Sequence, residues 1–118
     1  MAFKLNKAGC EHAAAMIRQG LEVEHETGNW NEVRPTSDEE ARYLDTHDIE
    51  EYGLWFLGIN TDIEANSKEH YVYPYGDFNV VQKSGLIAAE QQAKKDHSDE
   101  IANAARTLLE LLNQKKPR

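Results

Sequence analysis

The sequence predicts an α+β fold in which about four helices pack on a small antiparallel sheet of two or three strands. Two stretches, 7–19 and 98–112, carry apolar residues at intervals of three and four, which is the period of one face of an α-helix. Short aromatic runs at 54–59 and 71–73 have the length and composition of strands. Because 118 residues suffice for one hydrophobic core, we expect a single globular domain over 1–114.

Cysteine content and apolar segment lengths indicate the compartment. Cys10 is the only cysteine, which excludes an intrachain disulfide and a cysteine-based zinc cluster and suits a reducing compartment. Residues 1–7 lack the apolar segment of a signal peptide, and the run at 54–59 is too short to span a bilayer. We therefore expect a cytoplasmic protein without membrane contact. The last four residues, 115–118, form a basic tail that could be disordered.

The first helix is predicted to start after Asn6, a capping residue, and to stop at Gly20. Its apolar face follows the spacing i, i+4, i+7, i+11 at Cys10, Ala14, Ile17 and Leu21. Residues 21–26 alternate apolar and polar side chains only at their start, so they indicate a short edge strand or an extended arm. A turn at 27–29 follows.

A second helix is predicted to begin at Thr36 or Ser37, because either hydroxyl can cap it and acids fill its first turn. Ser37 and Glu40 have the spacing of a capping box. We expect the helix to end near 47–48, with its buried side formed by Ala41, Tyr43 and Leu44. Residues 49–53 then read as a turn leading into the strand 54–59, which we expect to pair with 71–73 in antiparallel orientation.

Pro74 is expected to end the second strand, because proline cannot donate a hydrogen bond to a neighbouring strand. Asp77 then has the position of an N-cap for a third helix that starts at Phe78. Gly85 inside that helix costs about 1 kcal/mol relative to alanine unless it admits a close neighbour. A break at 97–98 precedes the final helix.

Negative charge is concentrated in the middle of the chain. The net charge is −8, and residues 22–64 carry thirteen acids against Arg34 and Arg42. Such a field repels phosphate, so we expect no direct contact with nucleic acid, and it favours a basic protein partner or cations. A solvated acidic face that keeps the protein soluble is the alternative.

Metal or cofactor binding has little support in the sequence. The five histidines show no HxxxH or HExxH spacing, and no phosphate-binding glycine motif occurs. The best local set for acid–base chemistry is His70, Tyr73, Tyr75 and Asp77, beside aromatic residues that could exclude water. We therefore predict no metal, cofactor or catalytic residue, and keep a small enzyme with a site near His70, Tyr75 and Asp77 as an alternative.

Aromatic side chains cluster around the two predicted strands. They form either the core joint between sheet and helices or, in part, an exposed partner surface, since tyrosine and tryptophan are common interface anchors. The candidate interaction surface combines these rings with two nearby acids. Its residues are Trp55, Tyr71, Tyr73, Tyr75, Glu50 and Glu51.

The chain from about 70 to 112 resembles a short segment of small uncharacterised bacterial and phage-associated domains. The similarity lies in the turn Tyr73-Pro-Tyr-Gly-Asp77, an alanine-rich segment at 85–90, and a second helix carrying 101–105 and 108–112. It implies a prokaryotic or prophage origin and a structural role for the turn, and it carries over no activity.

Three functions remain open from the sequence. We expect a non-catalytic protein-interaction module or homo-oligomer, whose partner is another protein or a second copy of the chain. The first alternative is an acidic decoy that occupies a nucleic-acid-binding partner. The second is the small enzyme with its site near His70, Tyr75 and Asp77.

Overall fold

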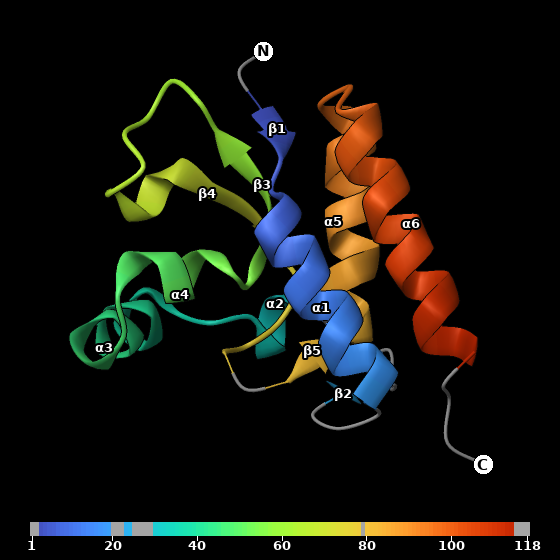
Figure 1. Cartoon of the computed structure of the whole chain (residues 1–118), viewed down its shortest axis with the longest axis horizontal. Helices are drawn as coiled ribbons and strands as arrows, with labels where there is room; N and C mark the ends of the chain where they lie inside the picture. Colours follow the sequence, from blue (N-terminus) through green and yellow to red (C-terminus); the bar gives the residue numbers. More distant parts are fainter. Residues whose placement is uncertain (1–2, 20–22, 25–29, 79, 115–118) are drawn as a thin grey trace.

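The computed structural model describes residues 3–19, 23–24, 30–78 and 80–114, and it confirms the predicted α+β class. Figure 1 shows the elements in chain order. They are β1 (Phe3–Leu5), α1 (Lys7–Gln19), β2 (Val23–Glu24), α2 (Trp30–Val33), α3 (Ser37–Thr46), α4 (Ile49–Gly53), β3 (Phe56–Asn60), the 3₁₀ turn η1 (Lys68–His70), β4 (Tyr71–Pro74), β5 (Val81–Gln82), α5 (Lys83–Lys95) and α6 (Asp99–Gln114).

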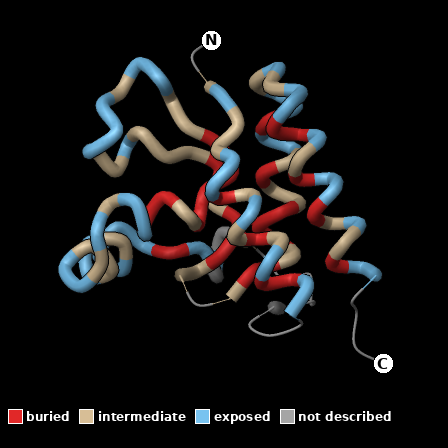
Figure 2. Tube along the Cα trace, viewed as in Figure 1, coloured by how far each residue is buried: buried red, intermediate tan, exposed pale blue. Residues whose placement is uncertain are grey.

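Three long helices, α1, α5 and α6, lie side by side and pack against the sheet (Figure 1). The break predicted between the last two helices is confirmed. His97 there has a φ of 58°, and Ser98 N donates to Ala93 O at 2.8 Å. The core lies between these helices and the sheet (Figure 2). Its largest fully buried side chains are Tyr52, Tyr75, Ile17, Leu57, Leu86, Ile101, Leu112 and Val81.

The main sheet has the strand order β1-β3-β4, and both pairings are antiparallel. The predicted pairing of the two aromatic segments is confirmed, with Gly58 opposite Val72 and Ile59 opposite Tyr71. The first of these strands starts at Phe56 rather than at residue 54, because the two preceding residues still belong to the turn after α4. The third strand, β1, was not placed from the sequence.

Residues 49–53 form the short helix α4, so the predicted turn is wrong. Asp48 caps it, since Asp48 Oδ1 accepts from Glu51 N at 2.9 Å and Glu51 Oε1 accepts from Asp48 N at 3.2 Å. The preceding helix α3 begins with the same reciprocal arrangement, but between Thr36 and Glu39 rather than at the predicted Ser37 spacing. Ala41 is exposed, contrary to its predicted place on the buried side.

Asp77 does not cap a helix, so the predicted helix start at Phe78 is also wrong. Asp77 Oδ1 accepts from Val80 N at 2.8 Å and closes a turn in which Phe78 has a φ of 67°. The chain then forms β5, which pairs in parallel with β2, and α5 begins only at Lys83. The predicted extended segment is described only at 23–24, where it is strand β2.

Gly85 inside α5 admits a close neighbour. A Cβ at Gly85 would lie 2.5 Å from the carbonyl oxygen of Tyr75. The absence of a side chain therefore lets α5 pass directly over the segment that follows β4. The helix stop at Gly20, the apolar position Leu21, the turn at 27–29 and the tail at 115–118 lie outside the described residues.

Asn6 joins the start of α1 to the α4–β3 turn. Its carbonyl oxygen accepts from Cys10 N at 3.1 Å, and its side-chain amide donates to the carbonyls of Gly53 at 2.8 Å and Phe56 at 3.0 Å. Among the described residues, no helix is both long enough and apolar enough to cross a membrane.

Candidate interaction surface

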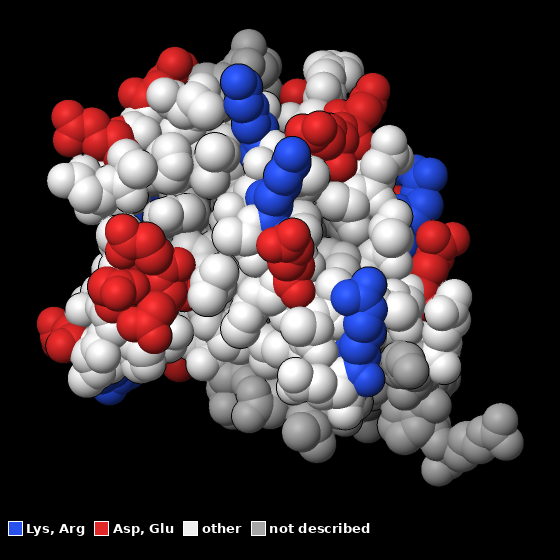
Figure 3. All heavy atoms as spheres, viewed as in Figure 1, with Lys and Arg blue, Asp and Glu red and all other residues white. Residues whose placement is uncertain are grey.

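Acidic side chains gather over the two helices α3 and α4 (Figure 3). In the stretch 37–51 the one base is Arg42. Hydrogen bonds from the Thr36 N–H and hydroxyl lower the pKa of Glu39, so this acid holds its charge at neutral pH. We call this surface the α3–α4 acidic face. Its exposed acids are Asp38, Glu39, Asp45, Asp48, Glu50 and Glu51.

A cleft of about 370 Å³ lies between β4, α2 and α5, and we call it the Trp30 cleft. Its polar groups are largely engaged with one another, because Asp96 accepts from the Tyr73 hydroxyl at 2.6 Å and from Gln92 Nε2 at 3.3 Å. Most of its lining is apolar or aromatic. The lining residues are Phe3, Trp30, Arg34, Val72, Tyr73, Pro74, Ala88, Ala89, Gln92 and Asp96.

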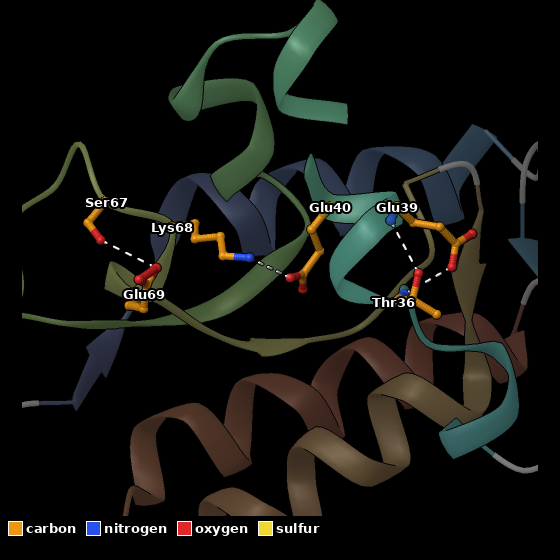
Figure 4. Close-up of polar contacts among 6 residues, drawn as sticks. All are labelled: Thr36, Glu39, Glu40, Ser67, Lys68 and Glu69. Atoms are coloured by element: carbon orange, nitrogen blue, oxygen red, sulfur yellow. Dashed lines mark hydrogen bonds and ion pairs between the residues drawn. The ribbon is translucent and has the colours of Figure 1, made fainter. Parts of the chain in front are cut away.

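A second cleft, of about 320 Å³, lies beside the acidic face, and we call it the Glu40 cleft. Lys68 on η1 reaches α3 there, and its Nζ lies 3.3 Å from Glu40 Oε1 (Figure 4). The rings of Tyr52 and Tyr71 stand edge to face, with centroids 6.1 Å apart. The lining residues are Arg34, Glu40, Tyr52, Phe56, Lys68, Glu69, Tyr71, Val72, Tyr73 and Pro74.

The tyrosines of the Glu40 cleft experience a negative field. Burial raises the pKa of Tyr52, and the charges of Glu40 and Glu69 raise it further. Burial also raises the pKa of Tyr71, and Glu50 adds to that shift. Both hydroxyls therefore remain protonated at neutral pH.

Three of the four aromatic residues of the candidate surface lie in the core. Trp55, Tyr73 and Tyr75 are 6%, 7% and 0% exposed, so at these positions the rings join the sheet to the helices. Tyr71 is half-buried, and Glu50 and Glu51 are exposed on α4. Only these last three lie where a partner could reach them, and a role for them in binding stays a prediction.

The structure does not bring together the side chains of His70, Tyr75 and Asp77. His70 Nδ1 lies 2.7 Å from Ile63 O, and the Tyr75 hydroxyl donates to Leu54 O at 2.6 Å. Asp77 Oδ1 accepts from Val80 N. None of the three lines the Trp30 cleft or the Glu40 cleft. Within the part of the chain that the structure describes, the three side chains therefore make separate contacts, and neither cleft joins them.

Metal ligands do not gather in the part of the chain that the structure describes, where no group of three or more His, Cys, Asp or Glu side chains could hold an ion. Cys10 is also unsuited to act as a nucleophile. Burial raises the pKa of its thiol to about 11, and the nearby Glu100 and Glu11 contribute. The thiolate is therefore scarce at neutral pH.

The sequence predicts only Tyr71 and Tyr73 among the residues that build the Glu40 cleft, as rings of the candidate interaction surface. Glu40 and Lys68 are 28 positions apart, and Tyr52 belongs to a segment that had been read as a turn. No spacing rule connects positions so far apart. A further signal that pointed to this region was the excess of acids over 22–64.

No family model matches this chain, and no curated protein or solved structure is significantly similar to it. The resemblance of residues 70–112 to bacterial and phage-associated domains stays a prediction. Function must therefore be inferred from the burial, the charges and the clefts of the molecule itself.

Proposed function

We propose that this protein is a non-catalytic interaction module that binds a basic surface of a partner protein through the α3–α4 acidic face. The observation that carries the proposal is the density of exposed acids over 37–51, where Arg42 is the one opposing charge. A single-sign patch of this kind steers an oppositely charged partner and favours its correct orientation.

The packing of α3 supports a role outside the core. None of its ten residues is buried, although Tyr43 stacks on Phe78 with ring centroids 4.5 Å apart. A helix that adds so little to the core, but carries a capping box and a row of acids, is suited to present charge to a partner.

The experiment uses a fluorescein-labelled decalysine peptide as the probe, with decaglutamate as the negative control, at low ionic strength. One double variant, Asp45→Asn with Glu50→Gln, removes two charges from the acidic face. The matched double variant, Glu11→Gln with Glu110→Gln, removes two exposed charges from α1 and α6. Fluorescence anisotropy gives the dissociation constant for each protein.

We expect decalysine to bind the natural chain and to lose affinity as salt is added. The first double variant should weaken binding about threefold or more, because each exposed charge contributes roughly 0.2–1 kcal/mol. The matched double variant should change the dissociation constant for decalysine less. Equal losses in the two variants, or no binding at all, would contradict the proposal.

A further inference from the structure

The Glu40 cleft opens next to the α3–α4 acidic face. Unlike that face, it is concave and encloses a volume. Tyr52 and Tyr71 provide aromatic sides, and carboxylates come from Glu40 and Glu69 on separate elements. With a volume of about 320 Å³ the cleft lies at the small end of ligand sites, which suits a single side chain. The cleft can therefore hold a side chain by its shape, whereas the acidic face attracts a partner by charge alone.

We propose that the Glu40 cleft is a subsite for one lysine or arginine side chain of the basic partner, and that Lys68, on the wall of the cleft, pairs with Glu40 until the partner's cation replaces it. This inference rests on the proposed function and names the group that the partner inserts. A cation there would meet the carboxylates of Glu40 and Glu69 and the ring of Tyr71, an arrangement that combines charge pairing with cation–π attraction.

Lys68 shows that Glu40 pairs with an ammonium group. Its Nζ lies 3.3 Å from Glu40 Oε1, and the two side chains are 38% and 21% exposed (Figure 4). The pair is part-buried, with Lys68 more exposed than Glu40. An ion pair that water reaches contributes little, so Lys68 can turn into solvent when another cation arrives. The pair is also the reason why the cleft is nearly neutral in the free protein.

The charges that line the cleft predict how removing Lys68 changes the affinity for a cationic partner. Lys68 and Arg34 line it together with Glu40 and Glu69, and the four charges balance. Once Lys68 leaves, two acids face one base, and the incoming side chain restores neutrality. Removing Lys68 from the protein should therefore raise its affinity for a cationic partner.

Strand addition to β4 is a less suitable way to hold the partner. β4 is the edge strand of the sheet, but it ends in Pro74, which has no N–H, and Tyr73 has a φ of 63°. Both features interrupt the regular hydrogen-bonding edge that a partner strand needs. Insertion of a side chain beside β4 does not require that edge.

The test compares Lys68→Gln with Lys94→Gln, using the same labelled decalysine probe. Lys94 is the control, because its Nζ lies 3.4 Å from Glu90 Oε2 on α5 and it does not line the cleft. Glu90 also pairs with Arg106, whose Nε lies 3.2 Å from the same oxygen. Each substitution removes one positive charge and one ion pair. We expect Lys68→Gln to strengthen binding at least threefold more than Lys94→Gln does.

A double-mutant comparison separates the subsite from long-range charge effects. In a protein that carries Glu40→Gln, the additional Lys68→Gln substitution should give no more gain than Lys94→Gln, because the carboxylate with which Lys68 pairs is gone. Equal gains for the two lysine variants in the natural background would overturn the subsite and leave the acidic-face proposal standing. Failure of the natural chain to bind the probe would overturn both.

Discussion

The Tyr73 hydroxyl donates a hydrogen bond of 2.6 Å to Asp96 Oδ2, which joins β4 to the C-terminal end of α5. Burial raises the pKa of Tyr73 to about 12, and the bond to Asp96 contributes to the shift. Because Tyr73 lines both clefts, this bond fixes the wall that they share. The position of β4 beside the acidic face therefore depends on a contact with a helix on the other side of the sheet.

Tyr73→Phe should lower the free energy of unfolding by about 1–3 kcal/mol, the usual contribution of a hydrogen bond to a charged group. Urea denaturation followed by circular dichroism measures the change. Tyr43→Phe is the control, since Tyr43 packs through its ring on Phe78 and His47 and should change stability by less than about 0.5 kcal/mol. Similar losses in the two variants would show that the Asp96 contact is not what stabilises this joint.

Gly85→Ala should destabilise the protein, although alanine is favoured over glycine in a helix by about 1 kcal/mol. The new Cβ would lie 2.5 Å from Tyr75 O. The free-energy cost of this overpacking exceeds the gain in helix propensity. We expect a net loss of about 1–2 kcal/mol in urea denaturation. As a control, Asn103→Ala at an exposed position of α6 should be neutral or slightly stabilising. A stabilising Gly85→Ala would contradict the close approach of α5.

Local signals in the sequence were sufficient for the long helices and for the pairing of β3 with β4, because side-chain periodicity encodes these elements. They were insufficient at Asp77. An aspartate carboxylate can cap a helix or close a turn, and only the hydrogen bond that it accepts from Val80 N shows that it closes a turn here. The capping pair Asp48 and Glu51 was a readable signal for α4, but five residues show no helical period. β1 spans three residues and becomes a strand only through its pairing with β3.

Ser84→Ala should leave the free energy of unfolding unchanged or raise it by up to about 1 kcal/mol. The Ser84 hydroxyl is buried on α5, and among the described residues it has no hydrogen-bond partner, so its desolvation is uncompensated there. Thr36→Ala provides the contrast, because the Thr36 hydroxyl caps α3 and its loss should cost about 1 kcal/mol. A loss at Ser84 equal to that at Thr36 would show that the Ser84 hydroxyl has a partner in solution.

Stability should fall as the pH rises from about 9 through about 11. The pKa of Cys10 is raised from 9.0 to about 11 by burial, so the unfolded chain loses this proton first and is favoured in that interval. Below pH 9 the thiol is protonated in both states, and its contribution is fully present. Thermal unfolding at a series of alkaline pH values should show this decline, and Cys10→Ala should reduce it. A melting temperature independent of pH over this interval would contradict the burial of the thiol.

The candidate site was harder to predict than the fold, because its parts come from distant segments. The acidic composition correctly indicated Glu50 and Glu51 as exposed charges, but ring content alone cannot separate the buried Tyr75 from the half-buried Tyr71. The ion pair between Glu40 and Lys68 requires η1 and α3 to be placed side by side. The packing of the whole chain places η1 beside α3, and no local sequence pattern predicts that placement.

The most direct test of the proposed binding surface is an amide chemical-shift titration of ¹⁵N-labelled protein with decalysine at low salt. We predict the largest shifts on α3 and α4 and at Tyr71 and Lys68, with α1 and α6 nearly unchanged. Largest shifts on α6, or shifts spread evenly over every acidic residue, would contradict the account.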